Sequence, residues 1–130
     1  MQEYKTVVRL PQSYLDLINQ IFEIEKKLSQ LQEANSIQRN INRIKTIIEE
    51  ELFKHKDEAN SFGISYHNPL NEPFDDTRTD CEANIAGSET ENLEITEVIK
   101  PIIFCSYFEN EKPVKRIVQK GVVVVKSKNH

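Results

Sequence analysis

The chain has 130 residues, a formal net charge of −4 at pH 7 and a pI near 5.4. This length suits one domain or two small ones, and the acidic balance disfavours non-specific nucleic-acid binding. No apolar run approaches the roughly 18 residues of a membrane span, and the first residues lack the apolar core of a signal peptide. Cys81 and Cys105 lie far apart in the sequence without the spacing of a known motif. We therefore expect both thiols to be reduced, as is typical of cytoplasmic proteins, and this protein to be cytoplasmic.

The first half of the chain predicts helix, because no Gly or Pro occurs between Pro11 and Gly63. Apolar residues recur there with three-four alternation, which places one apolar seam along a helix and favours a partner helix beside it. The first run of this seam consists of Tyr14, Leu17, Ile21, Ile24, Leu28 and Leu31.

The seam then shifts its phase, because Ile37 follows Leu31 after six residues instead of seven. Its second run is Ile37, Ile41, Ile44 and Ile48, and Ser36 is a candidate N-cap. We therefore predict two helices, 12–33 and 37–60, joined by a tight turn, with a single kinked helix as the alternative. A hairpin with a seam on each arm exposes an apolar strip, so we expect two copies to form a four-helix bundle.

After Gly63 the sequence is typical of strands and turns. Residues 93–99 (LEITEVI) alternate apolar and polar side chains and predict a half-buried strand. PIIFCSYF and VKRIV flank the turn-like ENEKP and predict a hairpin, and VVVV closes the chain as a buried strand. We expect an α+β protein with a dimerising helical hairpin, 1–62, and a small, mostly antiparallel β domain, 63–130.

Charge is divided unevenly within the second half. From Glu72 to Glu97 there are nine acidic residues and one base, Arg78, whereas from Val98 onward seven bases face two acids. Either the two groups neutralise each other across the sheet, or they form a bipolar surface that orients a protein partner.

No pattern in the sequence predicts catalysis, a metal site or a cofactor. The three histidines and two cysteines lack metal-ligand spacing, and three scattered glycines cannot form a phosphate loop. The spacing of His67 and Cys81 does not support a catalytic pair, and Asp75–Asp76 is typical of a turn or a helix cap. We therefore expect a protein that is not an enzyme.

The order of these segments resembles the GrpE family, the nucleotide exchange factors of DnaK-type chaperones. LPQSYLDLINQIFEIEKKL is similar to the first bundle helix of that family, and LFKHKDEANSFGI to the second, with Gly63 at its closing glycine. Phe74 and Asp75 match the start of a Phe-Asp-Pro signature. LEITEVIKP matches the strand before a Gln-Lys-Gly turn, and RIVQKGVVVV matches the terminal strand.

The chain departs from the family pattern at several positions. Asp76 replaces the family's Pro, Thr79 its His, Pro101 a turn Gly, and Gln119 an Arg of the last strand, whereas Arg116 matches a base that often precedes that strand. About ten residues precede Pro11, which is too short for the long N-terminal helical stalk of the family, so we expect a stalkless member.

The resemblance implies a homodimer whose β domains press on the nucleotide-binding domain of a DnaK-type chaperone and release ADP, without a cofactor. An adaptor of the same fold that binds another protein is the alternative. The partner-binding residues that the resemblance implies are Phe74, Asp75, Arg78, Lys115, Arg116 and Gln119. The residues expected at the dimer interface are Leu17, Ile21, Ile24, Leu28, Ile41, Ile44 and Ile48.

Overall fold

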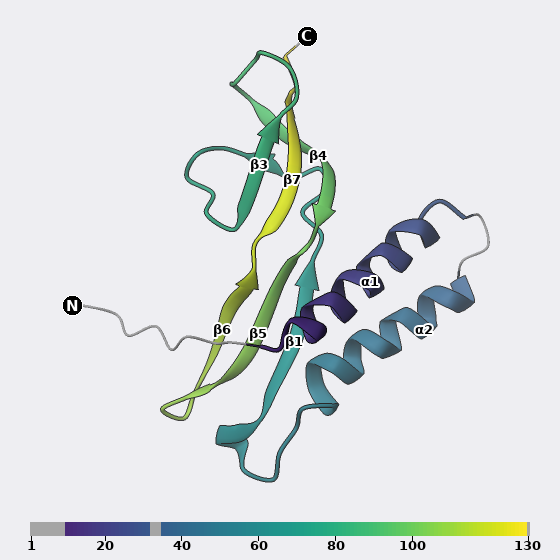
Figure 1. Ribbon diagram of the computed structural model, residues 1–130, viewed down its shortest axis with the longest axis vertical. Helices are drawn as coiled ribbons and strands as arrows, with labels where there is room; N and C mark the ends of the chain where they lie inside the picture. The colour runs from purple at the N-terminus through teal and green to yellow at the C-terminus, as the bar shows by residue number, and fades with distance from the viewer. Residues whose placement is uncertain (1–9, 32–34, 130) are drawn as a thin grey trace.

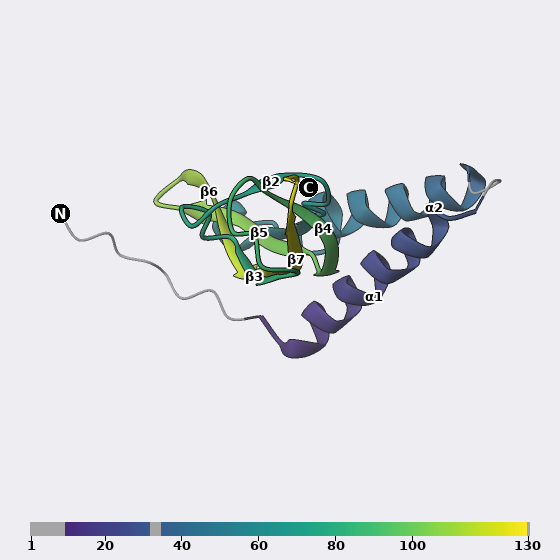
Figure 2. The same cartoon turned by 90° about the horizontal axis from the view of Figure 1, so that it is seen from above.

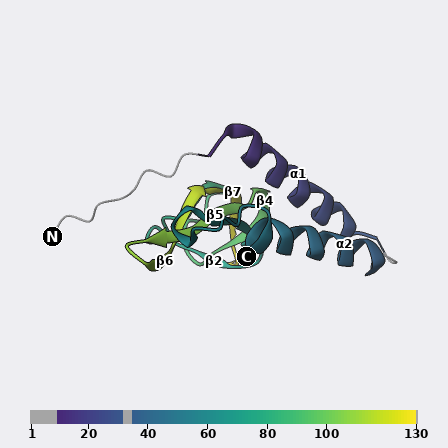
Figure 3. The same cartoon turned by 90° about the horizontal axis from the view of Figure 1, so that it is seen from below.

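The computed structural model describes residues 10–31 and 35–129 and has the predicted α+β class (Figure 1). Two helices lie beside a β domain, converging where α1 ends and α2 begins and diverging toward the sheet (Figures 2 and 3). The helical elements are α1 (Gln12–Leu28), α2 (Asn35–Thr46), a π-helical turn (Ile47–Glu51) that continues α2, and a short 3-10 helix (Glu58–Asn60).

The two-helix prediction is confirmed and the single kinked helix is wrong, but the predicted ends are wrong. α1 stops at Leu28, where Ser29 donates its backbone N–H to the Glu25 carbonyl. α2 starts at Asn35, so Ser36 lies inside its first turn and is not the N-cap. Of the predicted turn between residues 33 and 37, residue 34 lies outside the described residues, and Asn35 and Ser36 belong to α2. The helical segment that follows α2 stops at Glu51, not at residue 60.

In the described part of the chain, seven strands form two small sheets. The first sheet has the order β1-β5-β6 and the second the order β2-β4-β7-β3. The strands are β1 (Phe62–His67), β2 (Pro73–Phe74), β3 (Cys81–Ile85), β4 (Leu93–Lys100), β5 (Ile102–Glu109), β6 (Lys112–Gln119) and β7 (Gly121–Ser127). All pairings are antiparallel except that of β3 with β7. The mostly antiparallel prediction is confirmed, although the sequence analysis did not identify β1, β2 or β3.

The two sheets are the two halves of one long β ribbon. Only Pro101 separates β4 from β5, and only Lys120 separates β6 from β7. β5 pairs with β6 below this junction and β4 pairs with β7 above it, so the predicted hairpin and both predicted strands are present (Figure 1). The upper sheet therefore projects beyond the helices as a continuation of the lower one.

The helices pack against the lower sheet of the same chain. Ile64 of β1 and Ile103 of β5 lie in one apolar cluster with residues from both helical segments. Since burial of apolar surface is the main stabilising contribution to folding, this cluster fixes the hairpin on the sheet. It also joins residues on both sides of the predicted boundary at 62/63, and β1 begins at Phe62; the division into 1–62 and 63–130 stays a prediction.

The predicted apolar seam is divided between the inside and the outside of the chain. Four of its residues, Ile21, Leu28, Ile41 and Ile48, are buried in the chain's own core. The other three predicted interface residues are exposed, Leu17 at 54%, Ile24 at 47% and Ile44 at 38%. For the buried half of the seam, the sheet of the same chain thus takes the place that the sequence analysis assigned to a partner helix.

Close approach of two backbones sets where the helices meet the sheet. A Cβ atom on Gly63 would lie 1.9 Å from the Glu49 carbonyl oxygen. No side-chain movement can relieve this clash, because the positions of the Cβ atom and of the oxygen are both fixed by the backbone. Only glycine fits where a strand lies this close to another backbone. Gly63 therefore lets β1 pack directly against the π-helical turn.

A polar junction ties both helices to β1. The Glu25 carboxylate accepts hydrogen bonds from the Tyr66 hydroxyl at 2.6 Å and the Gln38 amide at 2.8 Å, and pairs with Lys45 at 3.3 Å. Lys45 also lies 4.9 Å from the centre of the Tyr66 ring. Burial alone would raise the pKa of Glu25, but these hydrogen bonds and the Lys45 charge outweigh it and lower that pKa.

We expect Glu25→Gln to lower the free energy of unfolding by about 1–2 kcal/mol at pH 7, since the buried partners lose a charged acceptor. The folded-state pKa of Glu25 lies below its ordinary value of 4.5, so its contribution is complete above about pH 4.5 and is lost as the pH falls further. Denaturant unfolding should therefore show that the difference in free energy of unfolding between wild type and Glu25→Gln becomes smaller as the pH is lowered from 7 to 3.

The matched control is Glu23→Gln, because Glu23 forms an exposed pair with Lys26 on the same helix. Such pairs contribute about 0–1 kcal/mol, so this variant should differ little from wild type at any pH. Equal effects of the two substitutions would contradict a structural role for the Glu25 junction.

Candidate functional site

The loop between β2 and β3 carries three of the six expected contact residues. Phe74 pairs with Leu93 of β4 and packs against the core cluster of the upper sheet. The aromatic side chain is half-buried, so it anchors the loop at one end. Asp75 follows immediately and is exposed.

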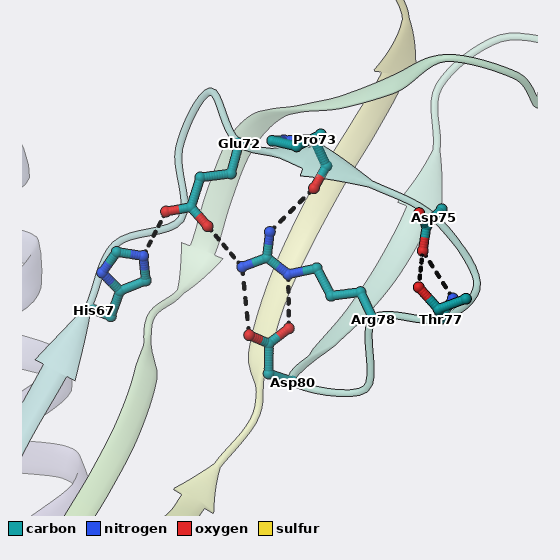
Figure 4. Close-up of polar contacts among 7 residues, drawn as sticks. All are labelled: His67, Glu72, Pro73, Asp75, Thr77, Arg78 and Asp80. Carbon is teal, nitrogen blue, oxygen red and sulfur yellow. Dashed lines mark hydrogen bonds and ion pairs between the residues drawn. The ribbon is translucent and has the colours of Figure 1, made fainter.

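Arg78 holds this loop through a network of four neighbours (Figure 4). Its guanidinium donates to Asp80 at 2.7 Å, to Glu72 at 2.8 Å and to the Pro73 carbonyl at 3.1 Å, and His67 contacts the second Glu72 oxygen at 2.5 Å. The Arg78 side chain is only 18% exposed. It therefore positions the loop and presents little surface to a partner.

The charges of this network determine its pKa shifts. Burial alone would raise the pKa values of Glu72 and Asp80, but the hydrogen bonds and charge of Arg78, with His67 on Glu72, lower both. The Asp80 hydrogen bond, opposed by burial, raises the pKa of Arg78. Glu72, Asp80 and Arg78 are thus ionised at neutral pH, when forked hydrogen bonds of Arg to carboxylates are strongest.

Asp75, like its neighbour Asp76, is a carboxylate of this loop that forms no hydrogen bond or ion pair with the Arg78 side chain among the described residues. It accepts from the backbone N–H of Thr77 at 2.9 Å and from the Thr77 hydroxyl, and these bonds lower the pKa of Asp75. The prediction that the Asp75–Asp76 pair makes a turn is confirmed for Asp75 (Figure 4). An exposed, ionised carboxylate that its own turn holds in place can form an ion pair with a basic side chain of a partner.

The other three expected contact residues lie on β6 and its end. Lys115 places its ammonium 4.4 Å from the centre of the Phe104 ring, on the face of the sheet opposite to the Ile64 and Ile103 cluster. Arg116, the next residue of the strand, lies on the opposite face from Lys115. Its Nε is buried without a hydrogen-bond partner among the described residues.

Gln119 faces inward. Its amide donates to the Pro101 carbonyl at 3.0 Å and exchanges hydrogen bonds with the Asn19 amide of α1 at 2.9 and 3.0 Å. Two positions that depart from the GrpE pattern, Pro101 and Gln119, are thus joined to each other at the bend of the ribbon. Gln119 links α1 to this bend and is poorly placed to contact a partner.

The six expected contact residues do not form one cluster. β2 is an edge strand of the upper sheet and β6 an edge strand of the lower sheet. Among the described residues, no hydrogen bond or ion pair joins Phe74, Asp75 or Arg78 to Lys115, Arg116 or Gln119. The structure presents two separate polar surfaces.

The acidic and basic halves of the β domain meet in the upper sheet, because β3 and β4 both pair with β7 and Glu94 lies opposite Lys126. Among the described residues, one ion pair joins them, Lys128 with Glu94 at 3.4 Å. Arg78 neutralises Glu72 and Asp80 within the acidic half itself. A bipolar surface therefore stays a prediction.

The thiols and histidines are not arranged for chemistry in the described part of the chain. Cys81 and Cys105 are buried, and burial raises the pKa of Cys81 to about 11 and also raises that of Cys105. His67 contacts Glu72, and the Nδ1 of His55 accepts from the Asp57 backbone; His130 lies outside the described residues. In residues 10–31 and 35–129, no cluster of three or more His, Cys, Asp or Glu side chains is suited to a metal ion.

Two surface hollows were missed by the sequence analysis. The larger, about 500 Å³, lies between the segment after α2 and the far end of the lower sheet, with Phe62, Tyr107 and Val114 on its floor. The second, about 270 Å³, is an apolar groove between the diverging helices, with exposed Leu17 and Leu52 at its sides. Both depend on how helices meet the sheet, which no local pattern predicts.

Comparison with known proteins identifies no relative, since no family model, curated protein or solved structure matches this chain. Among the described residues, no helix combines the length and apolar character needed to cross a membrane.

We expect Arg78→Lys to lower the free energy of unfolding by about 1–2 kcal/mol, because lysine keeps the charge but cannot bond two carboxylates and a carbonyl in one plane. Hydrogen exchange of the 75–80 backbone should accelerate. Arg43→Lys is the matched control, since Arg43 forms an exposed pair with Glu51, and it should change the free energy of unfolding by less than about 1 kcal/mol. Unchanged exchange in the loop would show that Arg78 does not hold it.

Proposed function

We propose that this protein is a cytoplasmic, GrpE-like homodimer that binds the nucleotide-binding domain of a DnaK-type chaperone and promotes ADP release. The observation that carries the proposal is a stripe of exposed apolar residues along a helical hairpin that supports a projecting β domain. The stripe comprises Leu17, Ile24 and Leu31 before the turn and Ile37, Ile44 and Leu52 after it. The order of segments and the motifs that resemble the GrpE family supply the class of partner.

The spacing of the stripe supports a helical partner. Leu17, Ile24 and Leu31 are seven residues apart, as are Ile37 and Ile44, which is the repeat of a helix-packing seam. Leu52 follows Ile44 after eight residues, across the π-helical turn. A π turn takes about one residue more than an α turn, so two turns there need roughly eight residues and Leu52 stays on the same face.

A second copy of the chain is the occupant that suits this stripe. Leu17 and Leu52 line one apolar groove, so the two arms of the hairpin present a joined surface and not isolated side chains. Monomeric proteins rarely leave apolar patches of this extent in water. Pairing the hairpins of two copies would form the four-helix bundle while the buried half of the seam stays on its own sheet.

The surface proposed to contact the chaperone is smaller than the sequence analysis expected. Asp75, with Phe74 beneath it, forms the acidic part, and Lys115 and Arg116 form the basic part. Arg78 and Gln119 act as positioning residues, since their side chains bond within the chain. Complementary charges on the chaperone would orient the complex and speed encounter.

The proposed activity needs no chemistry in this protein. A chaperone domain that alternates between closed and open states releases ADP faster when a partner binds the open state more tightly. The shift in population equals the ratio of the two affinities, so a hundredfold preference gives a hundredfold shift. Two ionic surfaces, one on the projecting upper sheet and one on the edge of the lower sheet, can supply that preference if only the open state reaches both.

We expect the double variant Ile24→Glu, Ile44→Glu to be monomeric and folded, because each charge would be buried only in the dimer. Sedimentation velocity at micromolar concentration should show a compact dimer for wild type and a monomer for the variant, with unchanged far-ultraviolet circular dichroism. Ile21→Asp is the contrasting variant: Ile21 is 6% exposed in the chain's own core, so it should lose stability itself. A monomeric wild type would refute the bundle.

We expect the wild-type protein to accelerate release of fluorescent ADP from the DnaK-type chaperone of its own organism by at least about tenfold, in line with the typical size of functional couplings. The single variant Asp75→Ala and the double variant Lys115→Ala, Arg116→Ala should each reduce this acceleration several-fold. Thr96→Ala, an exposed substitution on β4, serves as the control. Capture of a different protein, insensitive to ATP and ADP, with no effect on release would favour the adaptor function instead.

A further inference from the structure

The outer edge of β6 carries free backbone groups whose positions follow from the hairpin turn. Asn110 and Glu111 both have positive φ, 53° and 66°, as in the two-residue turn that joins antiparallel strands. Such a turn is flanked by a hydrogen-bonded pair, here Glu109 and Lys112, and bonded and non-bonded pairs then alternate along the ladder. Pro113, Lys115 and Ile117 therefore direct their backbone groups away from β5.

Pro113 supports this assignment independently. Proline has no N–H to donate and is tolerated in a sheet where the missing donor would face outward from an edge strand. Lys115 and Ile117 each present an N–H and a carbonyl to the outside, and β6 is the last strand of its sheet in the described part of the chain. The edge thus offers two donors and three acceptors at a regular spacing.

The side chains along this edge define what can pair with it. Lys115 and Ile117 lie on one face, because alternate residues of a strand share a face, and Arg116 lies on the other. Ile117 is an exposed apolar side chain, at 41%. Within the described residues no carboxylate forms an ion pair with Lys115, Arg116 or Lys120, and the sequence from Lys112 to His130 contains no acidic residue.

We propose that the outer edge of β6 binds an extended acidic segment of another protein by β-strand addition. The segment continues the β1-β5-β6 sheet through the backbone groups of Lys115 and Ile117. It places an apolar residue beside Ile117 and acidic residues beside Arg116 and Lys115, which in an antiparallel partner corresponds to the order apolar-acidic-acidic. A nucleic acid has no peptide N–H and carbonyl groups with which to continue the ladder, so the outward backbone groups of Lys115 and Ile117 favour a protein strand.

This inference specifies the chemistry met by the basic part of the proposed contact surface. It does not require that the partner be a chaperone. Binding is measured with isolated peptides, so failure of this inference and failure of the exchange function are distinguishable.

The test is fluorescence anisotropy of the full chain with a labelled peptide that repeats Val-Glu-Glu. We expect saturable binding that weakens with salt, none to a Val-Lys-Lys repeat, and a loss of about tenfold or more for Lys115→Glu. Equal affinity for an acidic peptide interrupted by prolines, or for a single-stranded oligonucleotide, would show that charge alone acts and would overturn the proposal. Absence of any binding would overturn it as well and would leave the lysine as protection against strand pairing.

Two variants separate the backbone from the side chain. Ile117→Pro removes the outward N–H and should lower affinity by about tenfold, whereas Ile117→Ala keeps that N–H and should lower it only a few-fold. If the proline variant does not fold, peptides methylated on alternate backbone nitrogens give the same information with wild-type protein. One of the two alternating methylation patterns should abolish binding and the other should not; equal effects of both would overturn strand addition.

Discussion

The contact between Gly63 and the Glu49 carbonyl is the constraint on which the rest of the structure depends. It lets the first strand lie directly against the helical segment that ends the hairpin, with no side chain between them. The approach brings Ile64 and Ile48 into one cluster. A larger residue at 63 would separate the two layers, and that cluster would lose its close packing.

The same approach determines which half of the helical seam remains outside. Once Ile21, Leu28, Ile41 and Ile48 are packed inward, Leu17, Ile24 and Ile44 of the same seam remain exposed. The π-helical turn keeps Leu52 in phase with Ile44 although the helix also has to meet β1. One hairpin can therefore pack against its own sheet and bind a second copy at the same time. The two contacts are coupled, because the Glu25 junction holds both helices in place.

Local patterns in the sequence predicted both helices and the strands β4 to β7, because helix and strand periods are set by neighbouring residues. They predicted the hairpin around ENEKP and the half-buried β4. Of the four valines of β7, however, only Val123 and Val125 are fully buried, so one face of that strand is covered more than the other. The patterns missed β1 and β2, most of whose residues lie in a segment with the composition of a loop. They missed β3, since CEANI lacks apolar alternation and pairs with β7, which lies some forty residues away along the chain. They also assigned the whole seam to a partner helix, because a periodic pattern shows that a face is apolar but not which surface covers it.

The candidate contact residues show the same limit at the level of single side chains. Arg78 and Gln119 were expected at the surface because they are polar and follow the family order, yet each bonds to groups distant in the fold or on another strand. What remains exposed is more instructive: Asp75 is ionised in a turn of its own, and Lys115 and Arg116 lie on an edge strand with free backbone groups. Asp75 follows β2 at the edge of the upper sheet, whereas the two bases lie on β6 at the edge of the lower sheet, so these exposed charges occupy the two halves of one ribbon. A partner with complementary charges would meet that ribbon in one orientation, and the bend that Pro101 and Gln119 hold would set the angle between its two contacts.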